Sequence, residues 1–218
     1  MRGGWLRSWE PAGVAVSLAV LALLTWQVST GGGVVRLDEH VYGRVGVVGS
    51  PLVTVLSDLG SPEVSGVVLG VFALHHSFFS GRWWPIVLAT GNGAMAAVVV
   101  LVLKAVTGRR GPGELPLEGY PGYFPSGHTA TAAVCFGTAT YIVGTSRRLH
   151  DASDAGVGAG LAVGIVVGAA TVLSGNHWAS DVAAGLAVAV LVLVLGFAVA
   201  RRHLTREDLS EPRRRLMT

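Results

Sequence analysis

The stretch GYFPSGHTATA, residues 122 to 132, places a Pro-Ser-Gly-His turn directly before a run of small residues. In a helix that begins after this turn, Ser126 can cap the N-terminus, and the first backbone N–H groups have no intrahelical partners. Such a terminus attracts anions, and Gly127 lets a ligand oxygen approach the backbone closely. The stretch therefore predicts an anion-binding helix start, although a plain cap with His128 facing water is compatible with the same residues.

The surrounding chain is too apolar for a soluble domain. Of its 218 residues 51% are hydrophobic and 13% are charged, and the apolar residues form long runs. We predict an all-α, polytopic membrane protein with one transmembrane domain over residues 1 to 200. A hydrocarbon core about 30 Å thick can be crossed by six stretches, namely residues 12 to 30, 62 to 79, 84 to 106, 127 to 145, 155 to 173 and 178 to 200.

Three further segments complete the expected layout. Residues 34 to 58 mix charges with apolar positions at helical spacing, which predicts a helix at the membrane interface or packed on the bundle. The first span follows Arg2 and Arg7 and has no clear small-residue cleavage pattern, so we expect an uncleaved anchor rather than a signal peptide. Residues 201 to 218 are polar and Arg-rich, and we expect a basic, solvated cytoplasmic tail.

The basic residues predict how the chain is oriented. With six spans and the N-terminus inside, eleven of the sixteen basic residues fall in inner segments and five in outer ones. Cytoplasmic segments carry the excess of Lys and Arg in membrane proteins. We therefore expect a multi-pass protein of the cell membrane with both termini in the cytoplasm. The five outer basic residues are Arg36, Arg44, Lys104, Arg109 and Arg110.

This orientation brings distant polar residues to the same side. The end of the third span, the start of the fourth and the turn between the fifth and sixth all lie outside the cytoplasm. Charged groups at span ends cost free energy unless they are paired or hydrated, which favours a shared extracytoplasmic site, although Lys and Arg can also snorkel to lipid phosphates. The candidate site residues are Lys104, Arg109, Arg110, Ser126, Gly127, His128, His177 and Asp181.

Two of these residues indicate a nucleophile. His177 and Asp181 are four positions apart and share one face of a helix. The carboxylate can hold one imidazole nitrogen as N–H and leave the other for a substrate, although a His-Asp pair can also simply pack the bundle. Together with His128, this pattern suits in-line phosphoryl transfer, in which His177 attacks phosphorus and His128 protonates the leaving oxygen.

The cations provide the remaining part of that chemistry. Lys104 and the arginines can hold the charge on the equatorial phosphate oxygens without a metal. No cluster of acidic residues with the character of a Mg²⁺ or Zn²⁺ site lies at these junctions. We therefore expect neither a metal nor a cofactor.

These residues resemble the motifs of the type-2 phosphatidic acid phosphatase superfamily. Its members are integral-membrane lipid phosphatases related to bacterial acid phosphatases and vanadium haloperoxidases. The family has three motifs: Lys, six residues, Arg-Pro; then Pro-Ser-Gly-His; then Ser-Arg, five residues, His, three residues, Asp. The resemblance runs from about residue 90 to 190, and the six-span layout extends it over most of the chain.

The matched positions inherit roles from the family. The resemblance implies that His177 is the nucleophile, that Asp181 orients it and that His128 is the general acid. It also implies phosphate contacts for Lys104, the only lysine of the sequence, and for Ser126 and Gly127. The second motif is intact as Pro125, Ser126, Gly127 and His128.

Both motif arginines are absent. Gly111 stands at the position of the first, and Ala170 and Thr171 replace the Ser-Arg pair. Removing one preorganised donor typically costs about 10²- to 10³-fold in rate. Arg109 and Arg110 lie two residues and one residue before Gly111, and we expect one of them to replace the missing guanidinium group, with Arg109 the first choice.

The sequence thus predicts a phosphoric monoester or diphosphate hydrolase acting on a membrane lipid at the outer face. Candidate substrates are a polyprenyl diphosphate, phosphatidic acid and phosphatidylglycerol phosphate. Two alternatives stay open: a lipid phosphotransferase of the same fold, and a non-catalytic relative that binds or moves phospholipid. We expect the bilayer and its lipid phosphates as partners and no nucleic acid, and the sequence leaves the oligomeric state open.

Overall fold

The computed structural model describes residues 8–114, 117, 119 and 121–210, without the side chains of residues 114 and 204–210. The described residues contain helices and no strand, which confirms the all-α class. The α-helices are α1 (Glu10–Ser29), α2 (Gly33–Val45), α3 (Pro51–Asp58), α4 (Pro62–Ser80), α5 (Trp84–Thr107), α6 (Gly127–Ser146), α7 (Ala152–Leu173) and α8 (Ala179–Ser210), and Pro112–Glu114 form a single 3₁₀ turn, η1.

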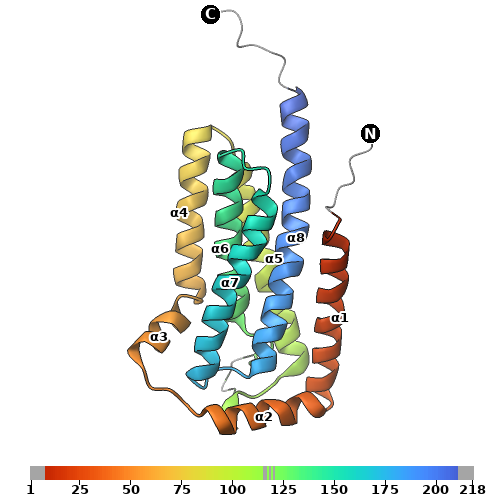
Figure 1. Ribbon diagram of the computed structural model, residues 1–218, viewed down its shortest axis with the longest axis vertical. Helices are drawn as coiled ribbons and strands as arrows, with labels where there is room; N and C mark the ends of the chain where they lie inside the picture. Colours follow the sequence, from red (N-terminus) through yellow and green to blue (C-terminus); the bar gives the residue numbers. More distant parts are fainter. Residues whose placement is uncertain (1–7, 115–116, 118, 120, 211–218) are drawn as a thin grey trace, which may run out of the picture.

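The six long helices run side by side, and α2 lies across one end of the bundle (Figure 1). Helices α6 and α8 connect the bundle, since α6 contacts α4, α5, α7 and α8, and α8 also contacts α1, α2, α5 and α7. The described ends of the chain, at the start of α1 and the end of α8, lie at the end of the bundle opposite α2 (Figure 1). The starts of α6 and α8 and the end of α5 therefore meet at the α2 end.

Glycines allow α6 and α7 to approach closely. A Cβ atom on Gly160 would lie 2.5 Å from the carbonyl oxygen of Ala133, and one on Gly156 would lie 2.9 Å from that of Gly137. Neither distance leaves room for a side chain. Small residues of this kind are typical of helix interfaces in membranes, where close backbone contact replaces the hydrophobic driving force.

Among the described residues, four helices are long and apolar enough to cross a membrane: α1, α5, α7 and the Ala179–His203 part of α8. The pair α3 and α4, bent by 55°, passes the same test together and gives a possible fifth span. The sequence predicts six. Helix α6 has 20 residues but contains five threonines, which lower its hydropathy, and it lies at the centre of the bundle, where neighbouring helices cover it.

Two expected segments differ from the structure. Residues 34 to 58 do not form one helix, because the chain turns at Gly46, whose φ of 67° favours glycine, and continues as the separate helix α3. Helix α8 also continues past residue 200, where the sequence predicts a solvated tail. Arg201 bonds both carboxylate oxygens of the buried Glu10, at 2.8 and 2.7 Å, and thereby ties α8 to α1. Residues 211–218 lie outside the described part.

Candidate active site

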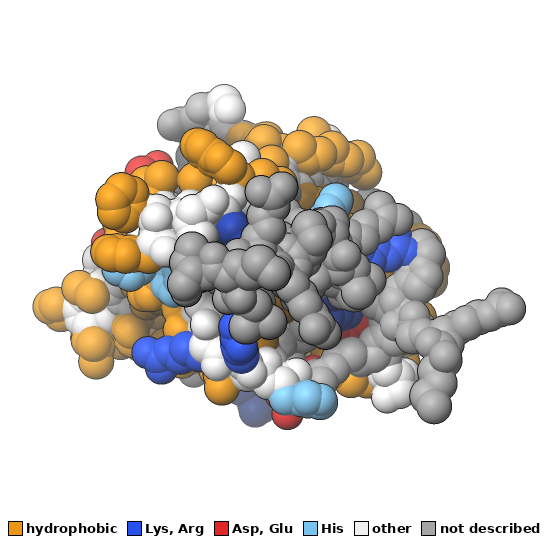
Figure 2. Space-filling model, turned by 90° about the horizontal axis from the view of Figure 1, so that it is seen from above, with side chains coloured by type: hydrophobic (Ala, Val, Ile, Leu, Met, Phe, Trp, Pro, Cys, Tyr) orange, Lys and Arg blue, Asp and Glu red, His pale blue; other side chains and the backbone are white. Residues whose placement is uncertain are grey.

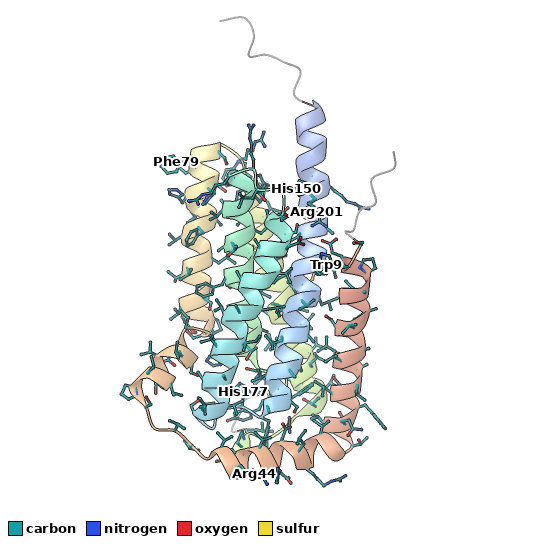
Figure 3. All side chains as sticks on the ribbon, viewed as in Figure 1. Trp9, Arg44, Phe79, His150, His177 and Arg201 are labelled. Carbon is teal, nitrogen blue, oxygen red and sulfur yellow. The ribbon has the colours of Figure 1, made fainter. Side chains whose placement is uncertain are left out.

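The predicted site residues of α6 and α8 meet at the α2 end of the bundle, where His177 lies (Figure 3). Ser126 precedes the first residue of α6, and Asp181 lies in the first turn of α8. The backbone N–H of Ser126 donates to the carbonyl oxygen of Asp181 at 2.9 Å, which joins the two helix starts directly.

His128 and His177 face the same small region. Their ring centroids are 6.3 Å apart, with an angle of 62° between the ring planes. His177 is buried, with 3% of its surface exposed, whereas His128 is half-buried. The ring of Tyr123 lies edge-on to that of His177, with the centroids 5.8 Å apart.

Asp181 holds His177 as the motif implies. Its Oδ2 atom lies 3.2 Å from Nδ1 of His177 and accepts a hydrogen bond from the backbone N–H of Trp178 at 3.0 Å. A carboxylate oxygen accepts, so the proton of the neutral imidazole lies on Nδ1. The lone pair of Nε2 is then available to a substrate.

The start of α6 is organised as the sequence predicts. Oγ of Ser126 accepts from the backbone N–H of Thr129 at 3.3 Å and from its hydroxyl at 3.0 Å. Lys104 is buried, with 3% exposure, and its Nζ donates to the carbonyl oxygen of Gly122. A Cβ atom on Gly127 would lie 4.0 Å from Cε of Lys104, so this ammonium group lies beside the helix N-terminus.

Arg109 also lies at the site, where its guanidinium group donates hydrogen bonds to three side chains. Nη1 donates to Oδ1 of Asp181 at 2.6 Å and to the hydroxyl of Ser180 at 2.8 Å, and Nη2 donates to Oδ2 of Asp38 at 2.7 Å. The guanidinium carbon lies 5.3 Å from the ring centroid of Trp178. Its predicted contact with phosphate stays a prediction.

The side chain of Arg110 is exposed. Its backbone carbonyl accepts a hydrogen bond from Nε1 of Trp178 at 2.9 Å, and its side chain lines an open cavity of about 470 Å³ between α1, α2 and the loop after α5. His128 and His177 do not line this cavity. Arg109 lines the same cavity, but of the two arginines it is the one that bonds Asp181, the partner of His177.

Thr171, at the position of a motif arginine, contacts His177 through its backbone, since its carbonyl oxygen accepts from the N–H of His177 at 3.2 Å. Its hydroxyl donates to the carbonyl of Gly168 at 2.8 Å, within its own helix, and the side chain is fully buried. The nearby Ser174 hydroxyl likewise donates to a backbone carbonyl, that of Thr171, at 3.2 Å.

Sequence reasoning missed Asp38 and Ser180. Asp38 lies in the stretch LDEH, where adjacent carboxylates give no indication of which one faces the bundle. Ser180 lies between the motif residues His177 and Asp181 and carries no signal of its own. Within the part of the chain that the structure describes, no three His, Cys, Asp or Glu side chains are grouped so that they could hold a metal ion.

The comparisons with known proteins agree with this arrangement. The sequence model of the PAP2 superfamily matches residues 82–204, more than half of the chain. The chain belongs to the PAP2 superfamily. Among solved structures, it is similar to the crystal structure of a transmembrane PAP2-type phosphatidylglycerolphosphate phosphatase from Bacillus subtilis, with a TM-score of 0.73. The identity is 19%, and the match covers 92% of this chain and 98% of the Bacillus chain.

A comparison with curated proteins gives no significant match. The family assignment confirms the resemblance seen in the motifs, and the structural match confirms the transmembrane PAP2 fold. Together with the apolar helices, they identify a multi-pass membrane protein and support a lipid phosphatase.

Proposed function

We propose that this PAP2 protein hydrolyses a phosphate monoester or diphosphate of a membrane lipid through a phosphohistidine intermediate. The observation that carries the proposal is the pair of imidazoles 6.3 Å apart, one of them held by a buried carboxylate. Productive reacting atoms lie about 3 to 3.5 Å apart, so a phosphoryl group between the two rings can contact both.

The proposed reaction has two steps. Nε2 of His177 attacks phosphorus, an N–P bond forms, and the P–O bond to the lipid breaks while His128 donates a proton to the leaving oxygen. Water then attacks the phosphohistidine, His128 takes a proton from it, and the N–P bond breaks to release inorganic phosphate. Asp181 keeps His177 in the required tautomer throughout.

The phosphate oxygens would be held by Lys104, by Ser126 and by the backbone N–H groups of Gly127 and His128. A buried ammonium group beside a helix N-terminus stabilises the charge of the transferring group, and it does so without reorganisation during the reaction. No metal is required for this scheme, so we expect turnover in the presence of EDTA.

We place the site on the extracytoplasmic face and both termini in the cytoplasm. The opposite end of the bundle carries Arg82, Arg147, Arg148, Arg201 and Arg202. Figure 2 looks onto that end and shows Lys and Arg side chains in blue. This distribution follows the positive-inside rule.

The test uses the purified protein in detergent with EDTA and a panel of a polyprenyl diphosphate, phosphatidic acid and phosphatidylglycerol phosphate. We expect phosphate release from at least one lipid and none from His177→Ala. Phosphate appearing on an added alcohol in place of water would identify a phosphotransferase. A folded protein that binds the lipids and releases no phosphate would instead be a non-catalytic relative, and the proposal would fail.

A further inference from the structure

We propose that Asp38 of α2 is a positioning residue for the reaction, acting on His177 through Arg109 and Asp181. This inference rests on the proposed function. Asp38 lies outside the three family motifs, and 142 positions separate it from its partner Ser180.

The connection consists of side-chain hydrogen bonds. Oδ2 of Asp38 accepts from Nη2 of Arg109 at 2.7 Å, Nη1 of the same guanidinium donates to Oδ1 of Asp181 at 2.6 Å, and Oδ2 of Asp181 lies 3.2 Å from Nδ1 of His177. The planar guanidinium presents its donors in a rigid fork. The position of Asp38 therefore fixes the orientation of Arg109, and Arg109 fixes the carboxylate that orients the nucleophile.

A second connection runs through Ser180. Oδ1 of Asp38 accepts from the backbone N–H of Ser180 at 2.9 Å, and the Ser180 hydroxyl donates to Oδ2 of Asp38. Ser180 directly precedes Asp181 in the first turn of α8. Asp38 thus contacts the guanidinium group of Arg109, which bonds Asp181, and the backbone and hydroxyl of Ser180, which directly precedes Asp181.

The burial pattern of α2 indicates that the helix places the carboxylate of Asp38 against Arg109 and Ser180. Among the residues of α2, all of which the structure describes, Asp38 is the only buried one, with 3% exposure. A helix that only covered the bundle would bury apolar side chains. Instead α2 lies across the end of the bundle (Figure 1) and inserts a carboxylate.

The two acidic and two basic side chains of the cluster balance one another, and the proton that His128 carries as the general acid of the proposed reaction is not part of this balance. Two carboxylates, Asp38 and Asp181, are buried with the cations Arg109 and Lys104. A buried charge that loses its partner is strongly unfavourable. Arg109 is therefore committed to the two carboxylates, which gives it a use other than direct replacement of the lost motif arginines.

The test compares Asp38→Asn with Glu39→Gln, the same change of charge at the exposed neighbouring residue of α2. We expect Asp38→Asn to lower kcat about 10- to 100-fold, since small misplacements of reacting groups cost this much, with little change in KM. Asp38→Glu should recover part of the loss, and Glu39→Gln should behave as the wild type. Thermal unfolding and size-exclusion profiles in detergent report whether each variant is folded.

A double-variant cycle separates positioning from a general effect on packing. If Asp38 acts in part through Arg109, Asp38→Asn should lower kcat by a smaller factor in the Arg109→Gln background than in the wild type. Multiplicative losses would overturn the proposal, as would a wild-type kcat for folded Asp38→Asn. If Asp38→Asn does not fold, Ser180→Ala provides a second test, because it leaves every charge in place. We expect Ser180→Ala to lower kcat several-fold, and an unchanged kcat in this variant would be decisive against the proposal. A wild-type protein without activity would instead refute the proposed function.

Discussion

The imidazole rings of His128 and His177 lie 6.3 Å apart although 49 positions separate them in the chain. One ring comes from the first turn of α6 and the other from the turn before α8. This proximity arises because the backbone of Ser126 bonds directly to that of Asp181 at 2.9 Å. The proposed mechanism assigns different roles to the two histidines, and these roles can be tested separately.

Removing either histidine should stop lipid hydrolysis, but at different steps. His177→Ala removes the nucleophile, so no phosphoenzyme should form with any substrate. His128→Ala removes a general acid, which costs about 10²- to 10⁴-fold. With an aryl phosphate, whose leaving group needs no proton, His128→Ala should still form phosphoenzyme. Trapping labelled protein under alkaline denaturation is the measurement, and phosphoenzyme in His177→Ala would contradict the assignment.

Arg109→Ala should be far more damaging than Arg110→Ala. The first change leaves Asp38 and Asp181 buried without the guanidinium between them, which typically costs about 3 to 5 kcal/mol. Arg110 is exposed, so its removal should leave stability and kcat close to the wild type. Thermal unfolding in detergent, together with turnover, measures both. Equal losses in the two variants would show that Arg109 has no special role.

Gly185→Ala should separate the two histidines without changing any charged group. A Cβ atom there would lie 2.8 Å from the carbonyl oxygen of Ser126 and 3.1 Å from Cβ of Thr129, so α8 and the start of α6 must move apart. We expect kcat to fall at least about tenfold, as for other small misplacements. The control is Gly158→Ala in α7, whose Cβ would meet nothing within 4 Å and whose helix propensity improves. Similar turnover in the two variants would contradict the close approach.

Arg201→Gln should lower stability but not the turnover of the folded protein. Arg201 bonds the buried Glu10 at the end of the bundle opposite His177 (Figure 3). Loss of this cation destabilises the buried carboxylate by up to about 3 to 5 kcal/mol. Arg147→Gln, at an exposed position of the same end, should change neither quantity. A reduced kcat for correctly folded Arg201→Gln would imply that the two ends are coupled.

The proposed orientation predicts which positions an impermeant thiol reagent reaches in whole cells. Arg44 and His150 are exposed and lie at opposite ends of the bundle (Figure 3). A sulfonated maleimide should label Arg44→Cys in intact cells and His150→Cys only after lysis. The native Cys135 is buried, with 4% exposure, which keeps the background low. The reverse labelling would place the site on the cytoplasmic face.

Much of the site was predictable because its signals are local. His177 and Asp181 are four residues apart and share a helical face whatever surrounds them, and Ser126 caps the helix that follows it. Hydropathy located the long helices to within a few residues, except at the end of α8, and their up-and-down order brings the relevant ends together. The break at Gly46 was missed because apolar positions at helical spacing continue on both sides of it.

The sequence by itself determined the family and the all-α membrane class, and it predicts which residues act on a phosphate, since these depend on spacing and composition along short stretches. Only the tertiary structure decided what Arg109 bonds to and that Asp38 reaches the site. An amphipathic pattern in α2 predicts a helix but not which of its charged residues faces inward. That choice depends on how α2 lies across α8, where a buried carboxylate is stable only because Arg109 and Ser180 meet it there.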